Sequence, residues 1–99
     1  MTINGIMEEG ILVATIEGRI DSVTSDTLET YIDVNVTDEI QGLTLDFADV
    51  DFISSKGLRV LVATKKKLGN RELLITHANS AVMEVFRLSG LLRIFKVEA

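Results

Sequence analysis

The 99-residue chain has no cysteine, no proline and no tryptophan, and it has a single histidine. The absence of cysteine excludes a disulfide framework and a thiolate metal site. No apolar run approaches the ~20 residues that a membrane-spanning helix needs, and the N-terminus lacks a basic region followed by an apolar one. The sequence therefore predicts neither a membrane span nor a signal peptide, and we expect a cytoplasmic protein.

The residues that are present describe an acidic domain with ample apolar content. Ninety-nine residues are the length of one domain, so we expect residues 1–99 to form a single domain. Hydrophobic residues make up 46% of the chain and charged residues 25%, which is enough for a core. The net charge of −5 and the pI of about 4.7 argue against nucleic acid as a partner. They fit a protein that meets a basic surface on another protein.

The segment 46–68 carries the strongest pattern in the chain. An apolar run punctuated by acids ends at Ser54 and Ser55, and apolar residues then recur at helical spacing as far as Leu68. Three lysines followed by Gly69 are typical of the end of a helix. We therefore expect a helix that begins at Ser54 or Ser55, where a hydroxyl can cap the first backbone N–H groups. A serine at this place can be only a cap, or it can carry a phosphate that the helix N-terminus stabilises.

The remaining segments alternate between strand and helix patterns. Two strands joined through Gly10 form a hairpin, and each later strand follows a helix. This predicts an α/β fold of order β-β-α-β-α-β-α-β, a mixed sheet of about five strands that opens with a hairpin and carries three helices. The expected strands are Thr2–Met7, Ile11–Glu17, Leu43–Phe47, Glu72–Thr76 and Ile94–Val97. The first helix begins at Ser25 or Asp26, and the third begins at Asn79 or Ser80 and turns Val82, Val85, Phe86 and Leu88 inward.

Three short motifs together point to a known family. Residues 18–21 read G-R-I-D, residues 52–58 read F-I-S-S-K-G-L, and residues 85–91 read V-F-R-L-S-G-L. They are similar to three sequences of the STAS domains, the family of bacterial anti-sigma factor antagonists. These are Gly-Glu-Leu/Ile-Asp, then an apolar pair with Asp-Ser-Ser/Thr-Gly and a leucine, then Leu-Phe-x-x-Ser/Thr-Gly-Leu. The resemblance covers residues 11–97 and implies a single STAS domain.

The resemblance also implies a function. In the family pattern, the unphosphorylated domain binds an anti-sigma factor that is also a serine kinase. Phosphorylation of one serine breaks this complex, and a serine phosphatase restores it. Ser55 takes the position of that serine, and the chain would be a regulator and not an enzyme, with ATP and metal held by its partners. The residues implied at the partner surface beside Ser55 are Asp21, Ser54, Lys56, Gly57, Leu58 and Arg59.

The chain departs from the motif on both sides of Ser55. Ser54 stands where the family has Asp, which removes a charge and adds a second hydroxyl. Lys56 stands where the family has a small hydroxyl residue, which adds a cation. These departures leave a second hypothesis open, a STAS subunit that is not phosphorylated and docks a nucleotide-binding subunit in a lipid-transport complex or a signalling scaffold.

No pattern in the sequence indicates catalysis or metal binding. His77 is the only histidine and follows a predicted strand, which is typical of a turn residue. No carboxylate–histidine–serine arrangement is recognisable, so a hydrolase that uses Ser54 or Ser55 lacks a base. Metal-ligand spacings, a phosphate-binding glycine loop and paired catalytic carboxylates are also missing, and we expect no cofactor.

Overall fold

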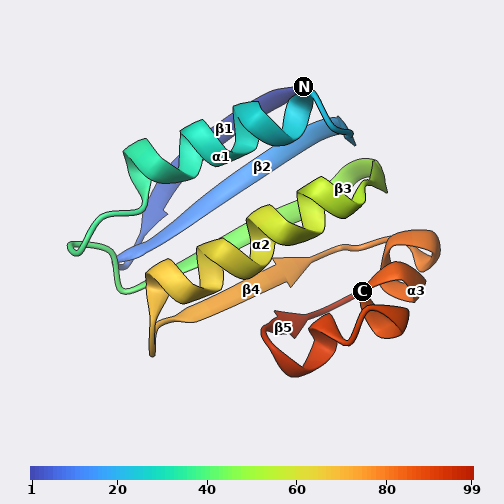
Figure 1. Cartoon of the computed structure of the whole chain (residues 1–99). Helices are drawn as coiled ribbons and strands as arrows, with labels where there is room; N and C mark the ends of the chain where they lie inside the picture. Colours follow the sequence, from blue (N-terminus) through green and yellow to red (C-terminus); the bar gives the residue numbers. More distant parts are fainter.

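A tight turn joins the first two strands into a hairpin. Strands β1 (Thr2–Glu8) and β2 (Ile11–Ile20) pair antiparallel, and Glu9 and Gly10 between them have φ angles of 51° and 87°. Glycine adopts a positive φ without steric cost, which places the turn at this point of the sequence. The structure, a computed structural model, describes residues 1–99 (Figure 1).

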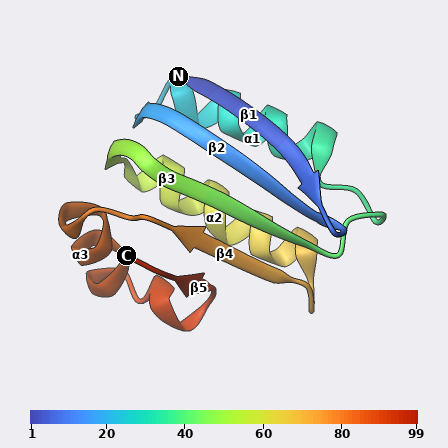
Figure 2. The ribbon, with the colours of Figure 1, turned by 180° about the vertical axis from the view of Figure 1, so that it is seen from behind.

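Helices separate the remaining strands, so these strands run parallel. The strand order β1-β2-β3-β4-β5 follows the chain, and every pair after the hairpin is parallel. Helices α1 and α2 cover one face of the sheet in Figure 1, and Figure 2 shows them behind it. The predicted α/β class and element order are confirmed. The elements after the hairpin are α1 (Thr24–Asn35), β3 (Gly42–Ile53), α2 (Ser55–Leu68), β4 (Glu72–Thr76), α3 (Ser80–Leu88), the 3-10 helix η1 (Leu91–Arg93) and β5 (Lys96–Val97).

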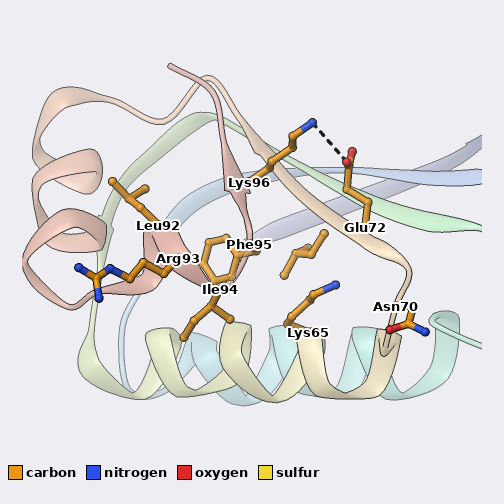
Figure 3. Close-up of a pocket in the computed structure, with 9 residues that line it drawn as sticks. Lys65, Asn70, Glu72, Leu92, Arg93, Ile94, Phe95 and Lys96 are labelled. Atoms are coloured by element: carbon orange, nitrogen blue, oxygen red, sulfur yellow. Dashed lines mark ion pairs between the residues drawn. The ribbon is translucent and has the colours of Figure 1, made fainter.

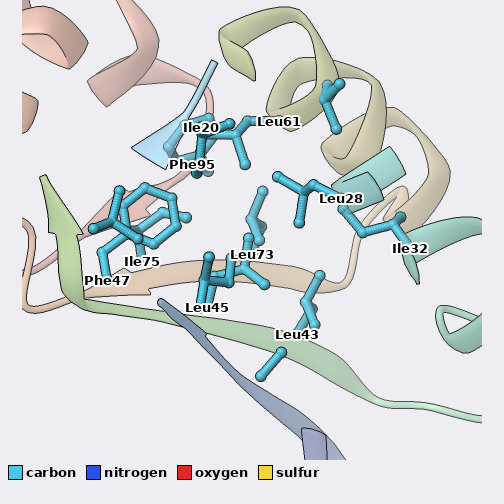
Figure 4. Close-up of a cluster of buried hydrophobic side chains, with 14 of the residues drawn as sticks. Ile20, Leu28, Ile32, Leu43, Leu45, Phe47, Leu61, Leu73, Ile75 and Phe95 are labelled. Atoms are coloured by element: carbon cyan, nitrogen blue, oxygen red, sulfur yellow. The ribbon is translucent and has the colours of Figure 1, made fainter. Parts of the chain in front are cut away.

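The core fills the space between the sheet and its helices. Leu43, Leu45 and Phe47 alternate along β3 and are buried on the covered face. Leu28 of α1 and Leu61 of α2 point toward them from the helix layer (Figure 4). Because the 23 buried apolar residues form one cluster, a single core holds all three helices on the sheet.

Helix α3 closes the core at the C-terminal side. Phe86 is fully buried, and its ring centroid lies 6.2 Å from that of Phe47 and 5.7 Å from that of Phe95. The ring of Phe95 meets it edge-on, a favoured arrangement of aromatic pairs. Through these contacts α3 and the segment before β5 are fixed to β3.

The C-terminal end of α2 is fastened to the loop before β3. The helix ends at Gly69, whose φ is 64° and whose N–H donates to the Lys65 carbonyl. Just beyond it, the Arg71 guanidinium donates to the carbonyl oxygens of Thr37, Ile40, Lys67 and Leu68. One planar cation therefore holds two connections together. None of the three helices has the length and apolar content required to cross a membrane.

Strands β2 and β3 are both longer than the sequence predicted. β2 continues to Ile20 and β3 to Ile53, and the two extensions pair with each other after irregularities in register. Exposed acids at positions 49 and 51 interrupt the apolar alternation of β3. The pattern therefore placed the end of that strand at Phe47.

Three details of the other elements are also corrected. Helix α1 begins at Thr24, and Ser25 is not a cap but is buried within the first turn. Leu88 points outward and is 72% exposed, because the nine-residue helix α3 ends there. The last strand is only Lys96–Val97, since Leu91–Arg93 form a 3-10 helix before it.

Candidate functional site

The two serines at the start of α2 have different roles. The Ser54 N–H donates to the Ile20 carbonyl (2.8 Å), and the Ser54 hydroxyl accepts from the Gly57 N–H (3.1 Å). Ser54 is therefore the N-cap that the sequence left open between two positions. Ser55 is the first residue of the helix, is exposed, and makes no side-chain hydrogen bond. Its hydroxyl is accessible, and the helix does not need it as a cap.

The surroundings of Ser55 favour an added anion. Among the backbone hydrogen bonds that close loops and caps, none uses the N–H of Ser55 or of Lys56. Unpaired N–H groups in a first helical turn carry the positive end of the helix dipole. An anion at this position would therefore meet unpaired donors and the positive end of the dipole.

Asp21 closes the turn between β2 and α1. Its Oδ1 accepts from the N–H groups of Val23 and Thr24, both at 2.9 Å, and from the Thr24 hydroxyl at 3.1 Å. The hydrogen bond from the Thr24 N–H is the main cause that lowers the pKa of the Asp21 carboxyl, against an opposing effect of desolvation. The Val23 N–H, the Thr24 hydroxyl and the Arg19 guanidinium lower this pKa further. Asp21 is therefore the cap of α1, although it precedes the helix by three residues.

A buried hydroxyl joins this turn to the start of α2. Ser25 is fully buried, and its Oγ donates to the Asp21 carbonyl at 2.5 Å. The same oxygen lies 3.5 Å from the Ser54 Oγ. Asp21, Ser54 and Ser55 are thus brought to one end of the sheet, where α1 and α2 both begin (Figure 1).

The Lys56 ammonium is bound by other residues of the chain. Its Nζ lies 2.7 Å from Asp26 Oδ1 and donates to the Ser22 carbonyl at 3.1 Å. It therefore spans from α2 to the first turn of α1. Arg59, one turn further along α2, is exposed and forms no ion pair.

Gly57 and Leu58 face the interior more than the solvent. Gly57 is buried, and Leu58 is half-buried against the core. A Cβ on Gly57 would lie 2.7 Å from Ile20 Cγ2 and 2.8 Å from Ile53 Cγ1. The missing side chain thus lets the first turn of α2 pack directly on the ends of β2 and β3.

We expect Gly57→Ala to destabilise the fold by about 1–3 kcal/mol through this overpacking. The sign is informative, because Gly to Ala in a helix normally stabilises by about 0.5–1 kcal/mol. Urea unfolding of the two proteins measures the difference. A variant more stable than the parent would show that the contact with Ile20 and Ile53 yields easily.

Sequence reasoning missed two exposed apolar side chains in this region. Val23 is 74% exposed directly before the first residue of α1. Phe52 is 40% exposed near the end of β3, with the Arg19 guanidinium 4.6 Å from its ring centroid. Val23 could not be found from the sequence, because the pattern placed the start of the helix at Ser25 or Asp26. Phe52 follows Asp49 and Asp51, and no pattern in this segment predicted that its ring is exposed.

The largest hollow of the structure lies elsewhere. Its volume is about 390 Å³, and it opens between the C-terminal half of α2, β4 and the segment before β5 (Figure 3). The Lys65 ammonium donates there to the Gly69 and Arg71 carbonyls, and Lys96 pairs with Glu72 at 3.5 Å. Since Lys65 is ten residues along α2 from Ser55, the hollow is about 15 Å from the serine. It is not part of the Ser55 surface.

The structure contains no arrangement typical of a hydrolase or a metal centre. His77 Nδ1 lies 3.0 Å from Asp46 Oδ1, and no serine hydroxyl completes this pair. The Ser54 hydroxyl contacts only the Gly57 N–H and the Ser25 hydroxyl. No group of three or more His, Cys, Asp or Glu side chains is placed to hold a metal ion.

Comparisons with known proteins agree with the geometry. The family model for the STAS domain matches residues 4–99. BtrV of Bordetella bronchiseptica, provisionally named as an anti-sigma factor antagonist, is 35% identical over 91 residues, 90% of this chain and 78% of that protein. The anti-sigma-F factor antagonist RsfB of Mycobacterium tuberculosis is 36% identical over 69 residues, 70% of this chain and 57% of RsfB.

A solved structure extends the likeness to three dimensions. The crystal structure of an anti-sigma factor antagonist from Mycobacterium paratuberculosis superposes with a TM-score of 0.90 and is 32% identical in sequence. The match covers 98% of this chain and 84% of that one. Sequence, element order and fold thus agree over nearly all residues, and the chain belongs to the STAS domain family.

Proposed function

We propose that the chain is an anti-sigma factor antagonist that works by switching partners. The unphosphorylated domain binds an anti-sigma factor with serine kinase activity, phosphorylation of Ser55 releases it, and a serine phosphatase reverses the modification. The observation that carries the proposal is the exposed Ser55 hydroxyl, which no capping role occupies. Relatives named as antagonists, at 32% to 36% identity, support the class of partner.

The switch follows from local charge. A phosphate adds a charge of about −1.5 to −2 at pH 7 and three acceptor oxygens. Asp21 directly follows β2, Asp49 and Asp51 lie in the last five residues of β3, and all three are at least partly exposed. A partner surface that fits a neutral hydroxyl at the start of α2 would meet a concentrated negative charge after phosphorylation.

Arg59 strengthens the same switch. It lies four residues after Ser55, on the same face of α2, and forms no ion pair in the unphosphorylated chain. A phosphate on Ser55 would attract this guanidinium. The partner would then lose a cation to contact as well as gain an anion to avoid.

In this proposal the chain has no catalytic role. ATP and its metal ion are held by the kinase, and the metal-dependent step of the reset is performed by the phosphatase. The chain contributes the acceptor hydroxyl and the surface that presents it.

A labelling experiment tests the proposal. The chain is incubated with ATP and a purified anti-sigma factor that has serine kinase activity, and the modified residue is mapped by mass spectrometry. We expect one phosphate on Ser55, and we expect Ser55→Ala to lose at least nine tenths of the label because the acceptor oxygen is gone. The fold should not change, since this side chain is exposed and caps nothing.

Ser80→Ala is the matched control. Ser80 is also exposed and is also the first residue of a helix, after the cap Asn79. It should keep full labelling. Equal labelling of the wild-type chain and Ser55→Ala would overturn the assignment. An unlabelled chain that instead binds a nucleotide-binding transporter subunit would support the alternative hypothesis of a docking module.

A further inference from the structure

Val23 is an exposed apolar residue at the start of α1. Its φ and ψ angles of −84° and −51° are already helical, and the Ser25 N–H donates to the Asp21 carbonyl, so the cap of the helix is Asp21 and not Val23. At 74% exposure, the valine side chain contributes little to the core. Nothing inside the chain therefore requires an apolar residue at this position.

The backbone that carries Val23 is held from both sides. The Ser22 carbonyl and the Val23 N–H belong to the same peptide group. Lys56 Nζ donates to that carbonyl at 3.1 Å, and Asp21 Oδ1 accepts from that N–H at 2.9 Å. Lys56 is itself fixed by Asp26 at 2.7 Å. The exposed side chain is therefore presented from a fixed backbone, so little ordering is left to do when a partner binds.

Val23 also lies beside the phosphorylation site that we propose. Lys56, which holds its peptide group, is the residue that follows Ser55 in the chain. Ser25 Oγ lies 3.5 Å from Ser54 Oγ, so the starts of α1 and α2 are in contact. A partner that docks at the start of α2 therefore has the start of α1 directly beside it.

We propose that Val23 is an apolar anchor for the partner that binds at Ser55, and that Lys56 is a positioning residue for Val23. The partner would offer a small apolar pocket next to the site that receives Ser55. It needs no acidic group for Lys56, because Asp26 already neutralises that ammonium. This proposal rests on the proposed function, which supplies the partner.

Val23→Ser tests the anchor. The unphosphorylated variant is titrated against the anti-sigma factor kinase in a calorimeter, and its dissociation constant is compared with that of the wild type. Because the Val23 side chain is exposed and contributes little to the core, the thermal midpoint should hardly change. The dissociation constant should nevertheless rise about tenfold or more, as for a buried apolar hot spot. Val34→Ser, at a residue of α1 that is 69% exposed and away from the junction, should change it less than about twofold. Equal affinity of Val23→Ser and the wild type would overturn the proposal.

The positioning role is tested by a double-mutant cycle with Lys56→Met, which keeps an unbranched side chain and removes the charge. Alone, this change should raise the dissociation constant about fivefold because the peptide group is no longer fixed. In the Val23→Ser background it should cost less than about twofold, since there is no anchor left to position. Additive losses would mean that Lys56 contacts the partner directly and would refute its positioning role. The thermal midpoint should hardly move, because exposed ion pairs contribute little to stability.

These outcomes separate the two proposals. A wild-type chain that the kinase neither binds nor labels refutes the proposed function, and the anchor falls with it. A wild-type chain that is bound and labelled, but whose affinity ignores Val23, refutes the anchor alone.

Discussion

Ser55→Asp is expected to weaken binding to the anti-sigma factor kinase about 100-fold, a loss of about 2.7 kcal/mol. The carboxylate mimics part of the phosphate charge at an exposed position where the wild type has a neutral hydroxyl. The chain itself should not be destabilised, because a negative charge in the first turn of a helix is favourable by about 0.3–1 kcal/mol. Calorimetric titration of the purified proteins measures the change in affinity.

Ser80→Asp separates the site from the local geometry. Asn79 and Ser80 repeat the arrangement of Ser54 and Ser55, a capping side chain followed by an exposed serine at the first helical position. The aspartate of the Ser80→Asp variant should interact equally well with a helix dipole. It should leave the affinity for the kinase unchanged. If both variants bind as tightly as the wild type, negative charge at Ser55 is not what releases the partner.

Phe86→Ala is expected to cost about 3–5 kcal/mol of folding free energy, the largest effect on stability that we predict. The fully buried ring packs on Phe47 and Phe95, and its removal leaves a cavity between α3 and the sheet. Since domains of this kind have only about 5–15 kcal/mol of stability, the variant should unfold at a much lower urea concentration.

Leu88→Ala in the same helix is the control for that measurement. This side chain is 72% exposed, so its loss should change stability by less than about 0.5 kcal/mol. Similar losses for the two variants would mean that α3 buries both residues, as the sequence pattern alone had suggested.

The fold could be predicted because most local signals agree with the final structure. Gly10 marks the hairpin, and the parallel strands alternate with helices of ordinary length. The prediction failed where tertiary contacts overrule the pattern. Ile53 belongs to β3 because β2 extends beside it, which no periodicity within β3 reveals. Leu88 has the right spacing for an inner position, but the helix ends before anything covers it.

The site was predicted less completely than the fold. The motifs single out Ser55 and Asp21, and the structure brings both residues to one end of the sheet, while their roles stay a prediction. The motif could not show that Lys56 is held by Asp26, because that ion pair joins residues 30 positions apart. Nor could it show that Gly57 is needed for packing against Ile20.

The order of the strands in the sheet has a consequence for how the protein is made. Each strand lies next to the one that precedes it in the chain, from β1 to β5. As the polypeptide emerges from the ribosome, every new strand can dock on an edge that already exists. A chain without proline also has no slow peptide isomerisation to wait for. Folding of the domain should therefore show no slow phase from proline isomerisation.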